Sequence, residues 1–388
     1  MVCFSEILRN RAQEKDEDSL VIEYLRFPLA VAVLLIHNFG SPVQMETLHQ
    51  NAISLSALFD FLRIAISHVA CHFANPAFFL ISGYLFWSKK TEWTLSIYKD
   101  KIKKRVRTIF FPYCLWIILY ITPDILNELW RIILYDKSFY HLLFYIYAIG
   151  DIHIFWDSST WGTNYTNWLG ISLSSSGPIL GPLWFLRDLM VAMAFSPIIH
   201  FTITKWGKWT ILVLWIFYLS LIWFPIHGFS IECYFWFSLG SFYAIEKKSL
   251  VKSIISFKVP AAAVYAILFP ILVWNNGRIG DGIHTNQLMQ ILYPIFVSAA
   301  VVILFCVFDK IAKSNLISFL PKLGAFSFFL FASHIQILHK VNHFFPYFPE
   351  PLKFISFPII TICLSLAIYL LLSKYIPSLS SHLTGNRR

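Results

Sequence analysis

Two ionisable side chains lie inside the first apolar segment of the chain, and both residue types can do chemistry. Arg26 and His37 belong to segment 21–39, VIEYLRFPLAVAVLLIHNF. On a helix their spacing of eleven residues is about three turns and roughly 16 Å, so both side chains lie on nearly the same face. Charged residues at membrane depth are costly and indicate a functional site by default. The pair therefore predicts a polar path into a membrane protein.

The chemistry of the two side chains differs. A neutral imidazole can take a proton from a hydroxyl group near neutral pH, which makes His37 a candidate general base. Arg26 stays charged and needs an anion, such as a phosphate, a lipid headgroup or the nearby Glu23. Both residues also have structural alternatives, because His37 could hydrogen-bond a neighbouring helix and Arg26 could simply pair with Glu23.

The composition predicts an integral membrane protein. Apolar residues make up 57% of the chain, charged residues only 13%, and the mean hydropathy is +0.63, whereas soluble domains have about 25% charged residues. Segments of helical length predict an all-α, polytopic helical bundle of about ten transmembrane helices. The predicted segments are 21–39, 69–87, 109–126, 183–203, 210–226, 230–245, 259–274, 288–308, 325–341 and 354–373.

The distribution of positive charge predicts the orientation. If all ten segments span, the loops on the side of the N-terminus hold 23 Lys and Arg, and the opposite side holds six when Lys340 at the end of segment 325–341 is included. Cations are retained on the cytoplasmic side, so both termini are expected there. We expect a cytoplasmic tail at 1–20, a membrane domain at 21–373 and a cytoplasmic tail at 374–388. The net charge of +10 then reflects topology, and no nucleic-acid partner is expected.

A dense basic cluster precedes the third segment, and its main candidates are Lys101, Lys103, Lys104, Arg105 and Arg107. One interpretation is an anchor on anionic lipid. The other is a site for a ligand with several phosphates, because Lys and Arg both bind phosphate oxygens.

Other polar motifs occur within the segments. Ser82 and Gly83 are typical of closely packed membrane helices. Arg187 and Asp188 are adjacent and should not face each other on a helix, so we expect a separate partner for each, with Glu232 a candidate for Arg187. The long stretch 127–182 includes an apolar part, 138–156, that we expect to be interfacial or re-entrant. The candidates for supporting roles are Ser82, Tyr84, Trp184, Arg187, Ser327 and His334.

Together these features resemble the membrane-bound acyltransferase-3 family. The resemblance rests on the spacing of Arg26 and His37 and on four ordered stretches: FFLISGYLFW at 78–87, KKRVRTIFFPY at 103–113, GPLWFLRDL at 181–189 and FSFFLFASH at 326–334. It implies a multi-pass protein of the cell (inner) membrane that moves an acyl group, most often acetyl, from acyl-CoA to a hydroxyl. The acceptor would be a glycan or another cell-envelope molecule. No bound cofactor or metal is implied, since acyl-CoA is a substrate.

The resemblance also assigns roles to residues. His37 matches the catalytic histidine and Arg26 its paired arginine, while Lys104 and Arg107 match a basic pair that is usually two arginines. Lysine at 104 keeps the charge but loses the bidentate fork, so Arg105 is an alternative. Phe331 stands where a tyrosine is common near the second histidine. His37 would act either as the base for direct transfer or as a transient acyl carrier.

Two other function classes fit some of these features. A transporter or flippase would also need buried charges and histidines, but transporters often show inverted repeats and the chain has none. A non-catalytic membrane scaffold would not require both Arg26 and His37 at membrane depth.

Overall fold

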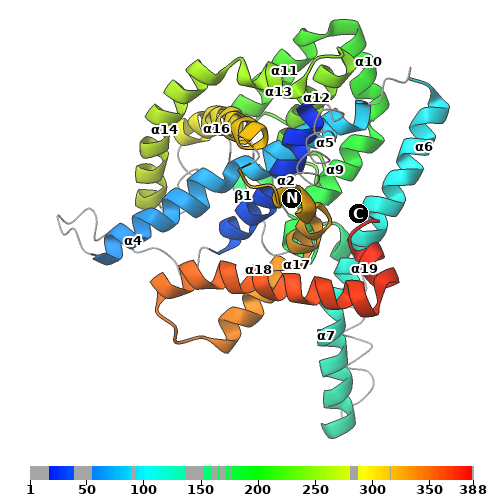
Figure 1. The fold of residues 1–388 in the computed structure, drawn as a ribbon, viewed down its shortest axis with the longest axis vertical. Coiled ribbons are helices and arrows are strands. Elements are labelled where there is room, and N and C mark those ends of the chain that lie inside the picture. Colours follow the sequence, from blue (N-terminus) through cyan, green and yellow to red (C-terminus); the bar gives the residue numbers. More distant parts are fainter. Residues whose placement is uncertain are drawn as a thin grey trace, which may run out of the picture.

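The computed structural model describes residues 17–38, 55–88, 93–135, 152–158, 164–166, 172–174, 176–279, 287–314 and 316–386, and these are almost entirely helical (Figure 1). The first half contains α2 (Glu17–His37), α4 (Leu55–Arg63), the π-helix η1 (Ile64–Val69), the 3₁₀ helix η2 (Ala70–Phe73), α5 (Ala74–Trp87), α6 (Leu95–Arg105), the π-helix η3 (Val106–Phe110), α7 (Phe111–Tyr135) and the 3₁₀ helix η4 (Ile152–Phe155).

The second half continues the helical bundle. It contains the 3₁₀ helix η5 (Gly181–Leu183), α9 (Trp184–Ala194), α10 (Ser196–Trp206), α11 (Lys208–Ser220), α12 (Ile231–Ile245), α13 (Leu250–Ile255), α14 (Lys258–Ile279), α16 (Gln287–Ser314), the 3₁₀ helix η6 (Leu320–Leu323), α17 (Gly324–Phe344), α18 (Glu350–Tyr375) and α19 (Pro377–Leu383). One addition to the predicted all-α fold is a small antiparallel hairpin of β1 (Asn164–Thr166) and β2 (Ser172–Ser174).

Hydroxyl side chains define where several helices begin. The Thr94 side chain accepts a hydrogen bond from the Ile97 amide at the start of α6. Ser230 does the same at α12 and Ser249 at α13. Such caps satisfy backbone amides that have no partner within the helix. Between α10 and α11 the chain reverses at Gly207, whose φ of 53° favours glycine.

Each of the ten predicted segments falls mainly on helix, but fewer meet the length and composition of a membrane span. Within the described residues there are six candidate spans, at Glu17–His37, Leu58–Trp87, Leu95–Leu134, Lys258–Asn275, Leu288–Ser314 and Glu350–Tyr375. The pair α9 and α10 is bent by 60° and would make a seventh. Helices α11 and α12 have 13 and 15 residues, fewer than the ~20 that cross a bilayer.

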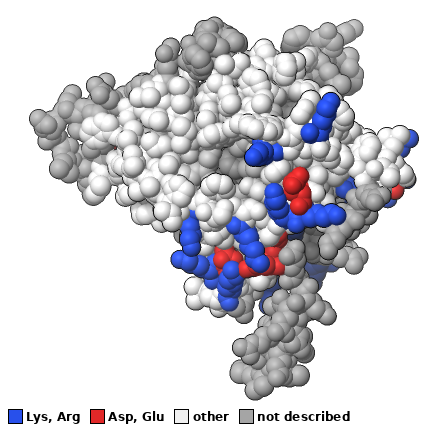
Figure 2. All heavy atoms as spheres, turned by 90° about the horizontal axis from the view of Figure 1, so that it is seen from above, with Lys and Arg blue, Asp and Glu red and all other residues white. Residues whose placement is uncertain are grey.

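Polar contacts join helix ends at each end of the bundle. On the side of the N-terminus, Lys101 donates to the Phe86 carbonyl at 2.7 Å and Glu17 pairs with Lys313 at 2.7 Å. On the opposite side, Asn38 donates to the Phe354 carbonyl at 2.9 Å. Figure 2 shows Lys and Arg gathered, with a few acidic residues among them, on one part of the face that it displays. These contacts hold neighbouring helix ends together, and several of the charged residues share one face.

Helices α5 and α12 make the closest backbone approach in the core. A Cβ added at Gly83 would lie 2.0 Å from the Phe237 carbonyl oxygen, and one added at Gly240 would lie 2.0 Å from that of Leu80. Small residues allow membrane helices to approach in this way. The packing role predicted for Gly83 is therefore confirmed.

We predict that Gly83→Ala lowers the thermal stability of the purified protein, because its methyl group would push α5 away from α12. Overpacking of this kind costs about 1–3 kcal/mol. The matched control is Gly324→Ala, whose Cβ would meet its nearest atom, Nη1 of Arg26, at an ordinary 3.5 Å. Thermal denaturation in detergent measures both, and equal melting temperatures for the two variants would contradict the prediction.

Candidate functional site

The predicted catalytic residues lie on the seam between α2 and α17. Nη1 of Arg26 lies beside Gly324, 3.5 Å from the position that a Cβ on this glycine would take. The rings of Phe27 and Phe326 are 5.9 Å apart, and the rings of His37 and His334 are 5.2 Å apart. Residue numbers rise together along both helices, so α2 and α17 run parallel. The structure thus brings the first and ninth predicted segments together in one direction.

Two histidines meet at the far end of this seam. His334 is fully buried, and its Nδ1 is 2.6 Å from the Phe331 carbonyl oxygen. A carbonyl only accepts, so Nδ1 holds the proton and Nε2 of the neutral ring has the lone pair. Within the described residues, Nε2 is buried with no hydrogen-bond partner. An imidazole acceptor therefore lies next to the partly buried ring of His37.

Arg26 lies at the opposite end of the seam, near the first residue of α17. The sequence left open an ion pair with Glu23, but in the described part of the chain Arg26 forms no ion pair or hydrogen bond. A guanidinium that is partly buried and keeps its donors free can bind an anion. This arrangement favours a ligand role for Arg26 over the simple ion pair.

The start of α2 is fixed by Asp18, which sequence reasoning placed in a polar tail. Its carboxylate is buried and accepts hydrogen bonds from the Tyr84 hydroxyl at 2.6 Å and the Ser249 hydroxyl at 2.7 Å. The amides of Leu250 and Val251 donate to it at 3.0 and 2.9 Å. An acidic residue directly before an apolar run was the only sequence signal for this position.

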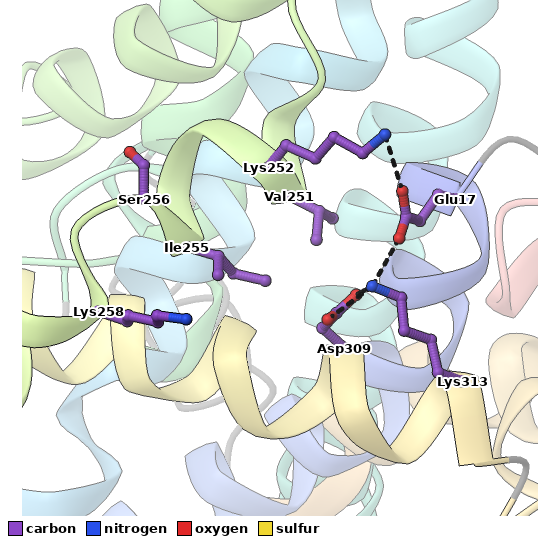
Figure 3. A pocket seen from close by; sticks show the side chains of 8 residues that line it. All are labelled: Glu17, Val251, Lys252, Ile255, Ser256, Lys258, Asp309 and Lys313. Atoms are coloured by element: carbon purple, nitrogen blue, oxygen red, sulfur yellow. Dashed lines mark hydrogen bonds and ion pairs between the residues drawn. The ribbon is translucent and has the colours of Figure 1, made fainter.

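Beside Asp18, Glu17 lines a cleft of about 280 Å³ between α2, α13, α14 and α16 (Figure 3). Its carboxylate bridges Lys252 at 3.3 Å and Lys313 at 2.7 Å, and Lys313 also pairs with Asp309 at 2.9 Å. These ion pairs join three helices around the first turn of α2. The cleft lies at the charged end of the bundle, and we assign it no part in the chemistry.

The basic cluster lies on α6 and η3, directly before α7. Lys103, Lys104 and Arg107 are exposed, and their side chains form no hydrogen bond or ion pair within the described ranges. Arg105 is partly buried. Lys101 differs, because its Nζ donates to the Phe86 carbonyl and lies 4.7 Å from the centre of the Trp87 ring.

The supporting candidates have mainly structural contacts. Tyr84 is the hydroxyl donor to Asp18. The Ser327 hydroxyl donates to the Leu323 carbonyl at 2.6 Å, and Trp184 packs against Phe79 at 6.2 Å between ring centres. Ser82 is partly buried in α5. Among the described residues, no group of three His, Cys, Asp or Glu could hold a metal ion.

The expectation for Arg187 was wrong. Its Nε donates to Asp188 at 2.9 Å, so the adjacent residues pair with each other, and no bond to Glu232 forms within the described chain. Nη1 of Arg187 also donates to the carbonyls of Trp156 and Ser176, at 2.5 and 2.8 Å. The rule that adjacent helix residues do not face each other concerns the directions of their Cβ atoms. The long, flexible side chain of Arg187 folds back in the first turn of α9 and so reaches Asp188.

The prediction for 138–156 lies largely outside the described residues. Its described end, η4, contacts the core: Arg187 donates to the Trp156 carbonyl just after it, and the Tyr113 hydroxyl donates to the Phe155 carbonyl. Helix α7 is also longer than the predicted 109–126 and ends at Tyr135.

We predict that Arg187→Ala destabilises the fold by about 3–5 kcal/mol, because it leaves the buried Asp188 carboxylate without its cation. The matched control is Arg131→Ala, which breaks the more exposed pair with Glu128 and should cost about 0–1 kcal/mol. Thermal denaturation compares the two variants. A loss at Arg187 no larger than the loss at Arg131 would show that the buried pair does not stabilise the fold.

Comparison with known proteins gives two matches. Residues 20–372 match the model of an acyltransferase domain, that of the acyltransferase-3 family. The chain is also 21% identical over 339 residues to the succinoglycan biosynthesis protein ExoH of Rhizobium meliloti (strain 1021). That alignment covers 85% of this chain and 83% of the relative. No solved structure matches the chain significantly.

Proposed function

This chain belongs to the membrane acyltransferase-3 family, and we propose that it transfers an acetyl group from acetyl-CoA to a hydroxyl group of a cell-envelope glycan. The chain is a multi-pass membrane protein, and the family match favours the acyltransferase over the transporter. A glycan acceptor draws support from the name of the relative, which refers to succinoglycan biosynthesis.

The observation that supports the chemistry best is the pairing of His37 with His334 on the seam that also contains Arg26. An acyl-CoA is a long molecule, with an anionic nucleotide at one end and a thioester at the other. Arg26 and His37 lie roughly 16 Å apart along α2, so one extended donor can reach both. In this proposal Arg26 holds an anionic part of the donor, and His37 acts at the thioester.

For direct transfer, a ring nitrogen of His37 removes the proton of the acceptor hydroxyl. The oxygen attacks the thioester carbonyl, the tetrahedral oxyanion collapses, and the CoA thiolate leaves and takes up a proton. His334 supports this step by offering its Nε2 as a hydrogen-bond acceptor beside His37. In the other route His37 attacks the thioester itself and holds the acetyl group until the acceptor arrives. Labelled acetyl-CoA without acceptor separates the two, because only the second route labels the protein.

The donor is proposed to bind on the cytoplasmic side, where the free cations Lys103, Lys104 and Arg107 offer several phosphate ligands. The acceptor is then used on the far side of the inner membrane. Three features support this direction: the 23-to-6 distribution of cations, the gathering of charged loops at one end of the bundle, and the shared direction of α2 and α17.

We predict that His37→Ala lowers the rate of acetyl transfer about 100- to 10,000-fold, the usual cost of losing a general base. The assay follows label from acetyl-CoA to a glycan acceptor and the release of free thiol by the purified protein. Melting temperature and donor binding establish that the variant is folded.

The matched control is His343→Ala, which removes an exposed imidazole from the helix that contains His334 and should leave the rate unchanged. If a folded His37→Ala protein transfers acetyl groups at the wild-type rate, His37 has only a structural role in helix packing. Absence of acetyl transfer by the wild-type protein with a range of glycans would count against the proposed reaction as a whole.

We also predict that both termini are cytoplasmic and that the loop between α14 and α16 is on the opposite side. Reporter fusions at the two ends, and labelling of a cysteine introduced between 280 and 286 with an impermeant thiol reagent in intact cells, measure this. An unlabelled cysteine in 280–286 that reacts only after lysis would contradict the layout.

A further inference from the structure

Three rings pack together at the start of α6, beside the basic cluster, and two of them are stacked. Trp93, the residue before the Thr94 cap, stacks on His200 of α10, with ring centres 5.5 Å apart and planes 20° apart. On its other side His200 packs against Trp87 at 5.0 Å. Trp93 is 37% exposed, so the outer part of the stack remains accessible. Trp87 is buried and His200 partly buried, so the accessible aromatic surface beside α6 is mainly that of Trp93.

The inward side of α6 is held firmly against the bundle. The Tyr98 hydroxyl donates to the Ala194 carbonyl at 2.8 Å, where α9 ends. Lys101 donates to the Phe86 carbonyl in the last turn of α5, which lacks a helical partner. These bonds and the ring stack fix both the position and the rotation of α6.

The outward side of α6 and of the following η3 has a row of cations. Lys99, Lys103 and Arg107 follow one another at intervals of four residues, are all exposed, and form no ion pair or hydrogen bond within the described residues. Asp100 is the single acidic residue of α6. Along the helix axis Lys99 lies roughly 9 Å from Trp93 and Arg107 roughly 21 Å. The aromatic surface thus stands at one end of a row of free cations.

The row of cations leads toward the membrane. Residues 95–134 form a 40-residue candidate span, and a helix of that length measures about 60 Å, twice the ~30 Å hydrocarbon thickness. The charged first part, α6, must then extend beyond the hydrocarbon, with Trp93 at its far end and Arg107 nearest the apolar α7.

We propose that the adenine base of the acyl-CoA donor stacks on Trp93. Lys99 and Lys103 then pair with the phosphates of the donor, and Arg107 lies where the donor turns toward the bundle. Proteins hold nucleotides by stacking the base on an aromatic ring and pairing the phosphates with nearby cations. The order of residues matches the order of groups in the donor: base, phosphates, then the thiol arm. This inference rests on the proposed use of acyl-CoA and adds the nucleotide-recognition site.

The test compares two donors that differ only in the nucleotide. Trp93→Leu should raise KM for acetyl-CoA about 5- to 50-fold and leave KM for S-acetyl-4′-phosphopantetheine, which lacks the adenosine part, at its wild-type value. Trp93→Phe keeps a ring and should restore most of the affinity. In a direct binding measurement that needs no acyl transfer, Trp93→Leu should weaken adenosine 3′,5′-bisphosphate by the same factor.

The control variant is Trp209→Leu on α11, which removes a tryptophan that is 60% exposed and should change neither KM. Equal increases in KM for both donors after Trp93→Leu would overturn the proposed stacking, because the change would then act on the fold. Unchanged values for both donors would also overturn it and identify Trp93 as an interfacial anchor. If the wild-type protein uses neither donor, the proposed function fails, which is a separate result from a failure at Trp93.

Discussion

The buried carboxylate of Asp18 is the interaction on which the position of α2, the helix of Arg26 and His37, depends. An ionised carboxylate in a low-dielectric interior costs several kcal/mol unless its oxygens are satisfied. Four donors surround it, from Tyr84, Ser249 and the amides of Leu250 and Val251. These four bonds hold the first turn of α2 against α5 and α13. Because α2 is continuous for 21 residues, fixing its start also fixes where Arg26 and His37 lie.

Helix α17 forms the second side of the candidate site. Helix α17 lies parallel to α2, so Arg26 meets its beginning and His37 meets His334 further along. Polar groups inside a membrane bundle are normally satisfied by neighbouring helices. Here the described residues leave the guanidinium of Arg26 and Nε2 of His334 without protein partners. In the proposed reaction the guanidinium of Arg26 would meet an anionic group of the donor, and the buried Nε2 of His334 would accept a hydrogen bond from His37.

The sequence was sufficient to predict the long apolar helices and the placement of Arg26 and His37 on one of them, because apolar runs and the spacing of 26 and 37 depend on local periodicity. It did not predict α6 as an element, since charged residues 99–107 suggested a loop until the Thr94 cap and the contacts of Tyr98 and Lys101 were visible. Asp18 was assigned to a tail because its partners lie as far as 233 positions away. The pairing of Arg187 with Asp188 depends on side-chain torsions, which residue spacing does not determine.

The last turn of α5 contacts both α6, where we propose that the donor binds, and α2, where we propose that the acyl group reacts. Its Tyr84 holds Asp18 and thereby α2, and its Phe86 carbonyl holds Lys101 and thereby α6. Gly83 fixes this turn against the backbone of α12, so the anchor itself has little freedom to move. A shift of α5 would displace α6 and α2 together, and with them the two proposed parts of the site. The stretch 78–87 therefore sets the distance between α6, where we propose that the donor binds, and α2, where we propose that its acyl group reacts.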